Sequence, residues 1–135
     1  MRRYLCCCIA AMGLSPNSWA DKVLTQLDHR QMTWLKPKET ITVKLPTDPG
    51  SGYLWFLERS DSALTTLHMA QDWRFIPRHK NQRQPIGDST WRFIARQEGD
   101  VTLRFIYRKP WQGPEIEPLD IREFRLVVAE QERNY

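Results

Sequence analysis

Residue types that could carry covalent or metal chemistry are few in this sequence, and they do not fall at the spacings such chemistry needs. The acidic residues suggest no carboxylate pair, and all three cysteines lie at residues 6–8. The histidines are scattered, without the short spacings of metal ligands; they are His29, His68 and His79. A nucleophile with a neighbouring general base is therefore not indicated. The sequence predicts a protein that is not an enzyme and holds no cofactor or metal.

The most constrained stretch is residues 46–55, which read Pro-Thr-Asp-Pro-Gly-Ser-Gly-Tyr-Leu-Trp. Its prolines fix φ, its glycines permit positive φ, and Asp48 and Ser51 can hydrogen-bond nearby backbone amides. A loop that is already ordered loses little entropy on docking, so this run suits a preformed binding edge. A plain surface turn between two strands explains the run equally well, and the run alone does not decide between the two.

A second stretch with binding chemistry begins where a patterned strand stops at Arg108 and continues with Lys109, Pro110 and Trp111. Proline holds such a loop open, and an exposed tryptophan offers up to ~200 Å² of surface to a partner's groove. The alternative is that Trp111 folds back and caps the end of the fold, with Pro110 only ending the strand. The residue pattern favours neither.

Short β-type runs separated by Pro, Gly and Asp signals surround these two stretches and predict an all-β fold. Residues 40–45 and 89–97 alternate cleanly between apolar and polar side chains, as do residues 101–107 and 121–128. We expect further strands at 23–27, 32–35, 64–67 and 73–76, a central strand at 53–58, and a tight hairpin turn at 98–100. These runs predict an immunoglobulin-like β-sandwich of about seven strands, with Trp55 in its core.

In that topology the loops after the second, fourth and sixth strands gather at one end of the sandwich. These are residues 46–52, the long basic loop 77–88, and residues 108–116. The expected binding surface is therefore one pole built by three loops.

Residues 1–20 have the pattern of a secretory signal peptide, with Arg2 and Arg3 before an apolar run and small residues at Ser18 and Ala20. Cleavage before Asp21 would take 20 of the 135 residues, leave a single domain over 21–135, and remove every cysteine. The mature domain is then expected to be disulfide-free, monomeric, and secreted or periplasmic, with no remaining membrane segment. Its net charge falls from +4 to +2, which does not favour a nucleic-acid partner.

Both binding stretches resemble motifs of one family, the chagasin family of cysteine-protease inhibitors. Residues 48–55 are similar to its Asn-Pro-Thr-Thr-Gly-Tyr-x-Trp signature, and residues 105–111 to its Tyr-x-Arg-Pro-Trp segment. The resemblance implies an immunoglobulin-like fold whose three loops enter the active-site cleft of papain-like cysteine proteases, reversibly and without covalent chemistry.

The resemblance also implies which residues bind the protease. The first loop would face the catalytic cysteine, Trp111 and Pro110 would pack on the primed side, and a glycine-containing piece of the long loop would make the third contact. The implied set is Asp48, Pro49, Gly50, Ser51, Gly52, Ile86, Gly87, Asp88, Arg108, Lys109, Pro110 and Trp111. Asp48, Gly50 and Lys109 depart from the family pattern, where asparagine, threonine and arginine stand.

A rival function is an exported module that binds polyanions or cell-envelope components through a basic outer face. Outward-facing arginines on two strands expected to be neighbours would join cations of the long loop. These residues are Arg92, Arg96, Arg104 and Arg108, with Arg78, Lys80 and Arg83. An outer sheet of solvated, interspersed charges is the simpler interpretation, because the net charge is small.

Overall fold

A computed structural model describes residues 22–80, 83 and 85–131, and the predicted signal peptide lies outside these residues. Within them the chain forms eight strands, one short α-helix and two 3-10 helices. The number of strands is slightly larger than the seven or so expected. In chain order these are β1 (Lys22–Leu24), η1 (Gln26–Asp28), β2 (Met32–Leu35), β3 (Thr40–Thr47), η2 (Pro49–Ser51), β4 (Leu54–Glu58), α1 (Asp61–Thr66), β5 (Leu67–Pro77), β6 (Gly87–Ala95), β7 (Gly99–Arg108) and β8 (Asp120–Val128).

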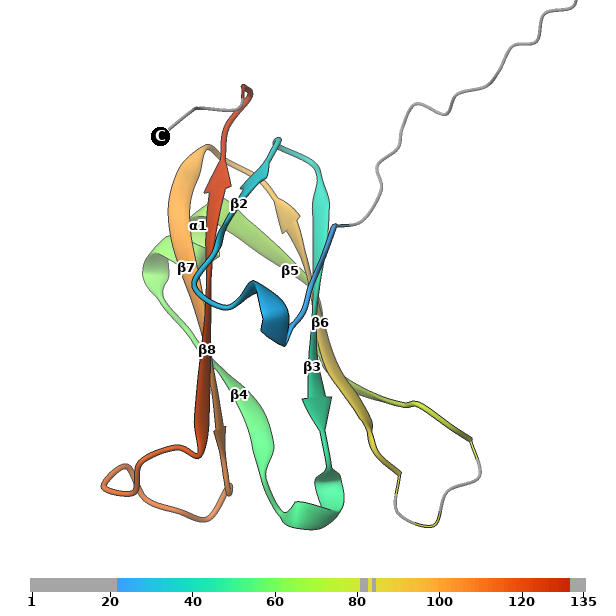
Figure 1. The fold of residues 1–135 in the computed structure, drawn as a ribbon. Helices are drawn as coiled ribbons and strands as arrows, with labels where there is room; N and C mark the ends of the chain where they lie inside the picture. Colours follow the sequence, from blue (N-terminus) through green and yellow to red (C-terminus); the bar gives the residue numbers. More distant parts are fainter. Residues whose placement is uncertain (1–21, 81–82, 84, 132–135) are drawn as a thin grey trace, which may run out of the picture.

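The strands form two four-stranded sheets that pack face to face, which confirms the predicted β-sandwich (Figure 1). The residues that the structure describes include no cysteine and so form no disulfide. One sheet has the order β1-β3-β6-β5 and the other the order β2-β8-β7-β4. The short strands β1 and β2 run parallel to β3 and β8, and the remaining pairs are antiparallel. Each sheet therefore keeps one short edge strand from the N-terminal part of the chain.

The core lies between the sheets and is built by the alternating residues that the sequence marks as inward-facing. Trp91 from β6 packs on Phe105 from β7 with ring centroids 4.6 Å apart, and Phe105 in turn contacts Phe124 of β8. Trp55 is buried as predicted. Because burial of large apolar side chains supplies most of the folding free energy, this core can hold the domain together without a disulfide.

Three connections lie together at one end of the sandwich, at the bottom of Figure 1. The β3–β4 loop crosses from one sheet to the other, whereas the β5–β6 and β7–β8 loops each join neighbouring strands of one sheet. We call this end the loop pole. The predicted grouping of the loops 46–52, 77–88 and 108–116 at one end is confirmed for their described residues, which exclude 81, 82 and 84.

The expected central position of residues 53–58 is wrong, because β4 is the edge strand of its sheet. Only Trp55 in this strand is buried. The neighbouring Phe56 packs against a side chain outside the core, with the Arg108 guanidinium 5.0 Å from its ring centroid. An unbroken apolar run therefore does not distinguish a central strand from an edge strand with packed faces.

The expected strand at residues 64–67 is also wrong over most of its length, because Asp61–Thr66 forms helix α1. Ser60 caps this helix, since its side chain accepts a hydrogen bond from the amide of Ala63 at 3.3 Å. Such a cap stabilises a first helical turn independently of apolar periodicity. Leu67 then begins β5.

The predicted hairpin at residues 98–100 is a third correction, because β6 and β7 belong to different sheets. The turn between them crosses the end of the sandwich opposite the loop pole. Its amides at Arg96 and Gln97 both donate to the carbonyl of Thr66, at the end of α1. A tight turn signal shows that the chain reverses, but not which sheet receives the next strand.

Replacing Gly87 with alanine is expected to destabilise the domain by about 2 kcal/mol, through overpacking against a backbone that cannot move aside. An added Cβ would lie 2.2 Å from the carbonyl oxygen of Ile76 and 2.7 Å from Cα of Pro77 on β5. Urea unfolding measures the change, with Gly50→Ala as the exposed control. Equal stabilities for the two variants would contradict the close approach of β5 and β6.

Candidate functional site

The β3–β4 loop is a closed, exposed turn held by its own hydrogen bonds. The Asp48 carboxylate accepts from the amide of Gly50 at 3.1 Å, and the Asp48 carbonyl accepts from the amide and hydroxyl of Ser51 at 3.0 and 2.6 Å. Pro49 occupies the first position of the 3-10 turn, where its missing N–H costs nothing. Residues 48–51 are therefore preorganised although they are exposed.

Gly52 ends this turn in the left-handed region, with φ of 85°. Its amide donates to the Pro49 carbonyl at 3.1 Å, and the next amide, that of Tyr53, donates to the Ser51 hydroxyl at 3.2 Å. A residue with a Cβ adopts this φ only with strain, so glycine is required for the chain to turn back into β4.

Trp111 lies against this glycine. Its Cη2 atom is 3.2 Å from the point where a Cβ on Gly52 would stand, so the indole rests on the bare backbone. The side chain is nevertheless 72% exposed. This exposure rules out the alternative in which Trp111 caps the sandwich end, and the contact joins the β7–β8 loop directly to the β3–β4 loop.

Lys109 and a column of aromatic rings hold the same two loops together from beneath. The Lys109 ammonium lies 5.2 Å from the Tyr53 ring centroid and 5.8 Å from that of Trp111, within cation–π range. Tyr53 stacks on Tyr107 at 5.4 Å, and Tyr107 contacts Trp55 at 4.6 Å. Lys109, which was predicted to bind the partner, thus contacts two aromatic rings of the protein itself.

Arg108 likewise braces its own loop. One guanidinium nitrogen donates to the carbonyl of Gln112 at 2.8 Å, and the amide of Gln112 donates to the carbonyl of Lys109 at 3.1 Å. These bonds close the chain around Pro110, which is exposed. Pro110 and Trp111 are therefore the members of this segment that face outward.

The β5–β6 loop brings its predicted residues to the same pole, but they differ in exposure. Ile86 is 45% exposed, whereas Gly87 is buried where β6 begins. Asp88 forms an ion pair with Arg78 at 3.3 Å, which ties the two ends of the loop. Close packing against β5 therefore explains why residue 87 is a glycine, whether or not it contacts a partner.

Sequence reasoning missed two exposed apolar side chains in the β7–β8 loop, Ile116 and Leu119, which are 46% and 64% exposed. They stand among prolines and acids, where neither strand nor helix periodicity marks an apolar face. An isolated isoleucine or leucine inside a proline-rich loop is the one signal that could have found them.

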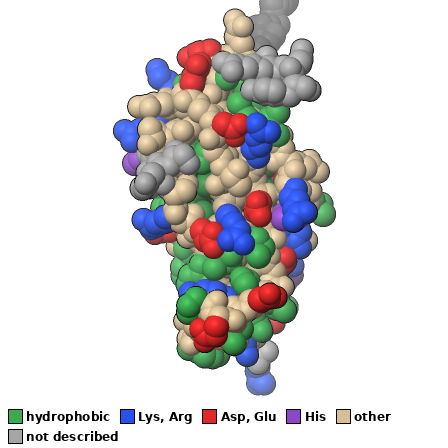
Figure 2. Space-filling model, turned by 90° about the vertical axis from the view of Figure 1, so that its left-hand side faces the viewer, with side chains coloured by type: hydrophobic (Ala, Val, Ile, Leu, Met, Phe, Trp, Pro, Cys, Tyr) green, Lys and Arg blue, Asp and Glu red, His purple; other side chains and the backbone are tan. Residues whose placement is uncertain are grey.

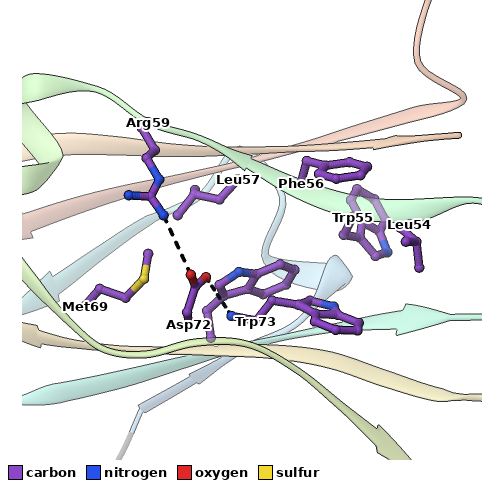
Figure 3. Close-up of a pocket in the computed structure, with 9 residues that line it drawn as sticks. Leu54, Trp55, Phe56, Leu57, Arg59, Met69, Asp72 and Trp73 are labelled. Carbon is purple, nitrogen blue, oxygen red and sulfur yellow. Dashed lines mark hydrogen bonds and ion pairs between the residues drawn. The ribbon is translucent and has the colours of Figure 1, made fainter. Parts of the chain in front are cut away.

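The edge strands β4 and β5 border an apolar cleft of about 350 Å³ on the side of the sandwich (Figure 3). Adjacent residues of β5, Asp72 and Trp73, both line it, because register shifts break the β5–β6 pairing here. Asp72 accepts from the amide of Trp73 at 2.7 Å and pairs with Arg59 across the cleft at 3.7 Å. This cleft lies beside the sheets and is separate from the loop pole.

Within the described residues no group of three or more His, Cys, Asp or Glu side chains is placed to hold a metal ion. The Nδ1 atom of His29 accepts a hydrogen bond from the amide of Glu123 at 3.0 Å and so anchors the chain before β2. No described helix is long and apolar enough to cross a membrane.

The continuous basic face that the rival function requires does not form, as the simpler interpretation of the sequence implied. Arg92 lies on β6 and Arg104 on β7, and these strands belong to different sheets with opposite outer faces. Arg104 is also bound by Glu58 at 2.7 Å, which raises the pKa of its guanidinium. Arg125 likewise bonds Asp100 and lowers the pKa of that carboxyl.

The fold and the site together define a β-sandwich with a preorganised loop pole at one end. The sequence model of the chagasin family of peptidase inhibitors, I42, matches residues 35–128, and the chain belongs to this family. The family consists of inhibitors, so the chain is not expected to be an enzyme. No curated protein matches it significantly.

Solved structures share the fold at low sequence identity. The cysteine protease inhibitor EhICP2 from Entamoeba histolytica superimposes with a TM-score of 0.69 and 20% identity, over 80% of this chain and 95% of that chain. Amebosin superimposes with a TM-score of 0.59 and 17% identity, over 81% of this chain and 98% of that chain. PbICP-C, solved in complex with falcipain-2, superimposes with a TM-score of 0.52 and 12% identity, over 86% of this chain and 96% of that chain.

Replacing Gly52 with alanine is expected to cost about 1 kcal/mol of stability and to displace the Trp111 indole, because the new Cβ meets both a strained φ and the ring. Urea unfolding measures the first effect and near-UV circular dichroism the second. Gly50→Ala is the matched control, since Gly50 lies in the same turn without a positive φ. If both variants behave alike, the packing of Trp111 on Gly52 does not constrain the pole.

Proposed function

We propose that this chain is a reversible, non-covalent inhibitor of papain-like cysteine proteases that fills the active-site cleft with its loop pole. The observation that carries the proposal is the packing of Trp111 on Gly52, which fuses two loops into one exposed wedge. Membership of a family of peptidase inhibitors supports the same conclusion.

The β3–β4 loop is suited to occupy the cleft without being cleaved. Residues 49–51 form a hydrogen-bonded 3-10 turn rather than the extended strand that proteases bind as substrate. Because the turn is already closed in the free protein, docking costs little conformational entropy. In this proposal Pro49, Gly50 and Ser51 face the catalytic cysteine, and Gly52 turns the chain away.

Trp111 is the proposed anchor on the primed side of the cleft. Large aromatic side chains that are exposed before binding and buried after it dominate many interfaces. Pro110 stiffens the chain beside it, and Lys109 holds the indole from beneath. A typical protease–inhibitor contact buries about 1,600 Å² in total, which the three loops of one pole can supply.

Titration of papain with the mature protein tests the proposal against the rival binding module. Stoichiometric, reversible loss of papain activity is expected, with no binding to heparin or single-stranded DNA at physiological salt. Fully active papain at saturating protein, across a panel of papain-like proteases, would overturn the inhibitor function. Salt-sensitive polyanion binding with active protease would favour the rival.

Replacing Trp111 with alanine is expected to weaken inhibition by about 2 kcal/mol or more while leaving the melting temperature nearly unchanged. The side chain is 72% exposed, so its removal takes little from the core. Inhibition constants and thermal melts measure the two effects. Leu27→Ala is the control, because that side chain is 80% exposed and outside the loop pole. Equal inhibition by both variants would remove Trp111 from the interface.

We also propose that residues 1–20 act as a signal peptide and that the domain works after export. Support comes from the paired arginines, the apolar run and the small residues before Asp21. Expression with a native N-terminus in a bacterial host is expected to yield exported protein that begins at Asp21, as read by N-terminal sequencing. Protein that stays inside the cell with residues 1–20 attached would contradict export.

A further inference from the structure

Over the two sheets, several charged side chains are paired with partners of opposite sign. Arg104 bonds Glu58 and also lies 3.8 Å from Glu123, and Arg125 bonds Asp100. Lys22 lies 3.9 Å from Glu39, Arg59 pairs with Asp72 across the cleft, and Arg122 pairs with Asp120 on the same strand. The charges of these pairs are therefore compensated within the protein, whereas the exposed Lys44 and Arg74 form no ion pair with another described residue.

The β5–β6 loop departs from this pattern. His79, Lys80 and Arg83 are exposed, and among the described residues no ion pair joins them to an acid. Arg78 alone pairs, with Asp88. This side of the loop pole therefore carries uncompensated positive charge from Lys80 and Arg83 at neutral pH.

The β7–β8 loop carries the opposite sign. Glu115 and Glu117 are exposed, and no ion pair of the described part of the chain neutralises them. Figure 2 shows acidic side chains among hydrophobic ones at the lower end of the molecule, on the side where this loop lies. The loop also carries one cation, Lys109, which lies 5.2 and 5.8 Å from the Tyr53 and Trp111 ring centroids. With one lysine and two glutamates, residues 109–119 have a net charge of −1.

The two charged loops flank the β3–β4 loop from opposite sides. The β5–β6 loop belongs to one sheet and the β7–β8 loop to the other, and the β3–β4 loop spans the gap between the sheets (Figure 1). The loop pole is thus electrically polarised: positive on one flank and negative on the other.

We propose that this polarity selects the target: a papain-like protease whose cleft has acidic side chains along one rim, opposite the β5–β6 loop, and basic side chains along the other. The inference rests on the proposed function and adds the electrostatic class of the partner. Uncompensated charges at an interface rim steer diffusional encounter and reject partners of the wrong sign, so the effect appears mainly in the association rate. Exposed charges act this way only where salt does not screen them.

The test uses the papain-like protease that the wild-type protein inhibits most tightly in the panel described above. Association rates are measured between 20 and 500 mM NaCl, about the range over which screening becomes effective. The variants are Lys80→Glu/Arg83→Glu and, separately, Glu115→Lys/Glu117→Lys. The control Lys44→Glu/Arg96→Glu changes net charge as much as the first variant, but at exposed positions outside the three loops.

Each loop variant is expected to associate about tenfold more slowly at low salt, with the difference lost at high salt, and the control is expected to change less than about twofold. If loop variants and control share one rate and one salt dependence, the polarity does not select the target, although inhibition by the wild type still stands. Faster association by either loop variant would overturn the assigned signs. If the wild type inhibits no protease of the panel, the proposed function itself fails.

Discussion

The contact between the Trp111 indole and the bare backbone of Gly52 is the constraint on which the loop pole depends. It needs a glycine for two reasons at once, because φ is 85° and because a side chain would occupy the space of the ring. It joins a hairpin of one sheet to the connection between both sheets. Since each loop is tied to the other, neither has to be ordered by a partner.

Beneath this contact, buried apolar side chains hold the exposed loops in place. Trp55 is buried in the core, and its indole donates to the carbonyl of Pro46 at 3.0 Å, at the base of the β3–β4 loop. Tyr107 and Tyr53 extend the stack outward to Lys109. The order of the exposed loops is therefore continuous with the order of the core, which is how a small domain without disulfides can present a rigid edge.

The strand pattern was predictable wherever one face is buried, as at Ile41 and Val43, because alternation reports burial directly. The prediction failed where the residue pattern does not indicate which strand pairs with which. Leu54 and Phe56 belong to an edge strand although their run looks central, and the turn before Gly99 leads to the other sheet instead of a hairpin. Helix α1 was missed because a single capped turn is too short to show a period.

By itself, the sequence determined which residues form turns, which alternate along strands and which two stretches carry the loop motifs, because φ preferences and side-chain periodicity act between near neighbours. Only the tertiary structure decided that Trp111 rests on Gly52, that Lys109 faces inward to two aromatic rings, and that Gly87 is buried against β5. It also decided that opposite charges flank the pole. These relations join residues distant in the chain, and they depend on strand order and sheet packing, which no local preference encodes.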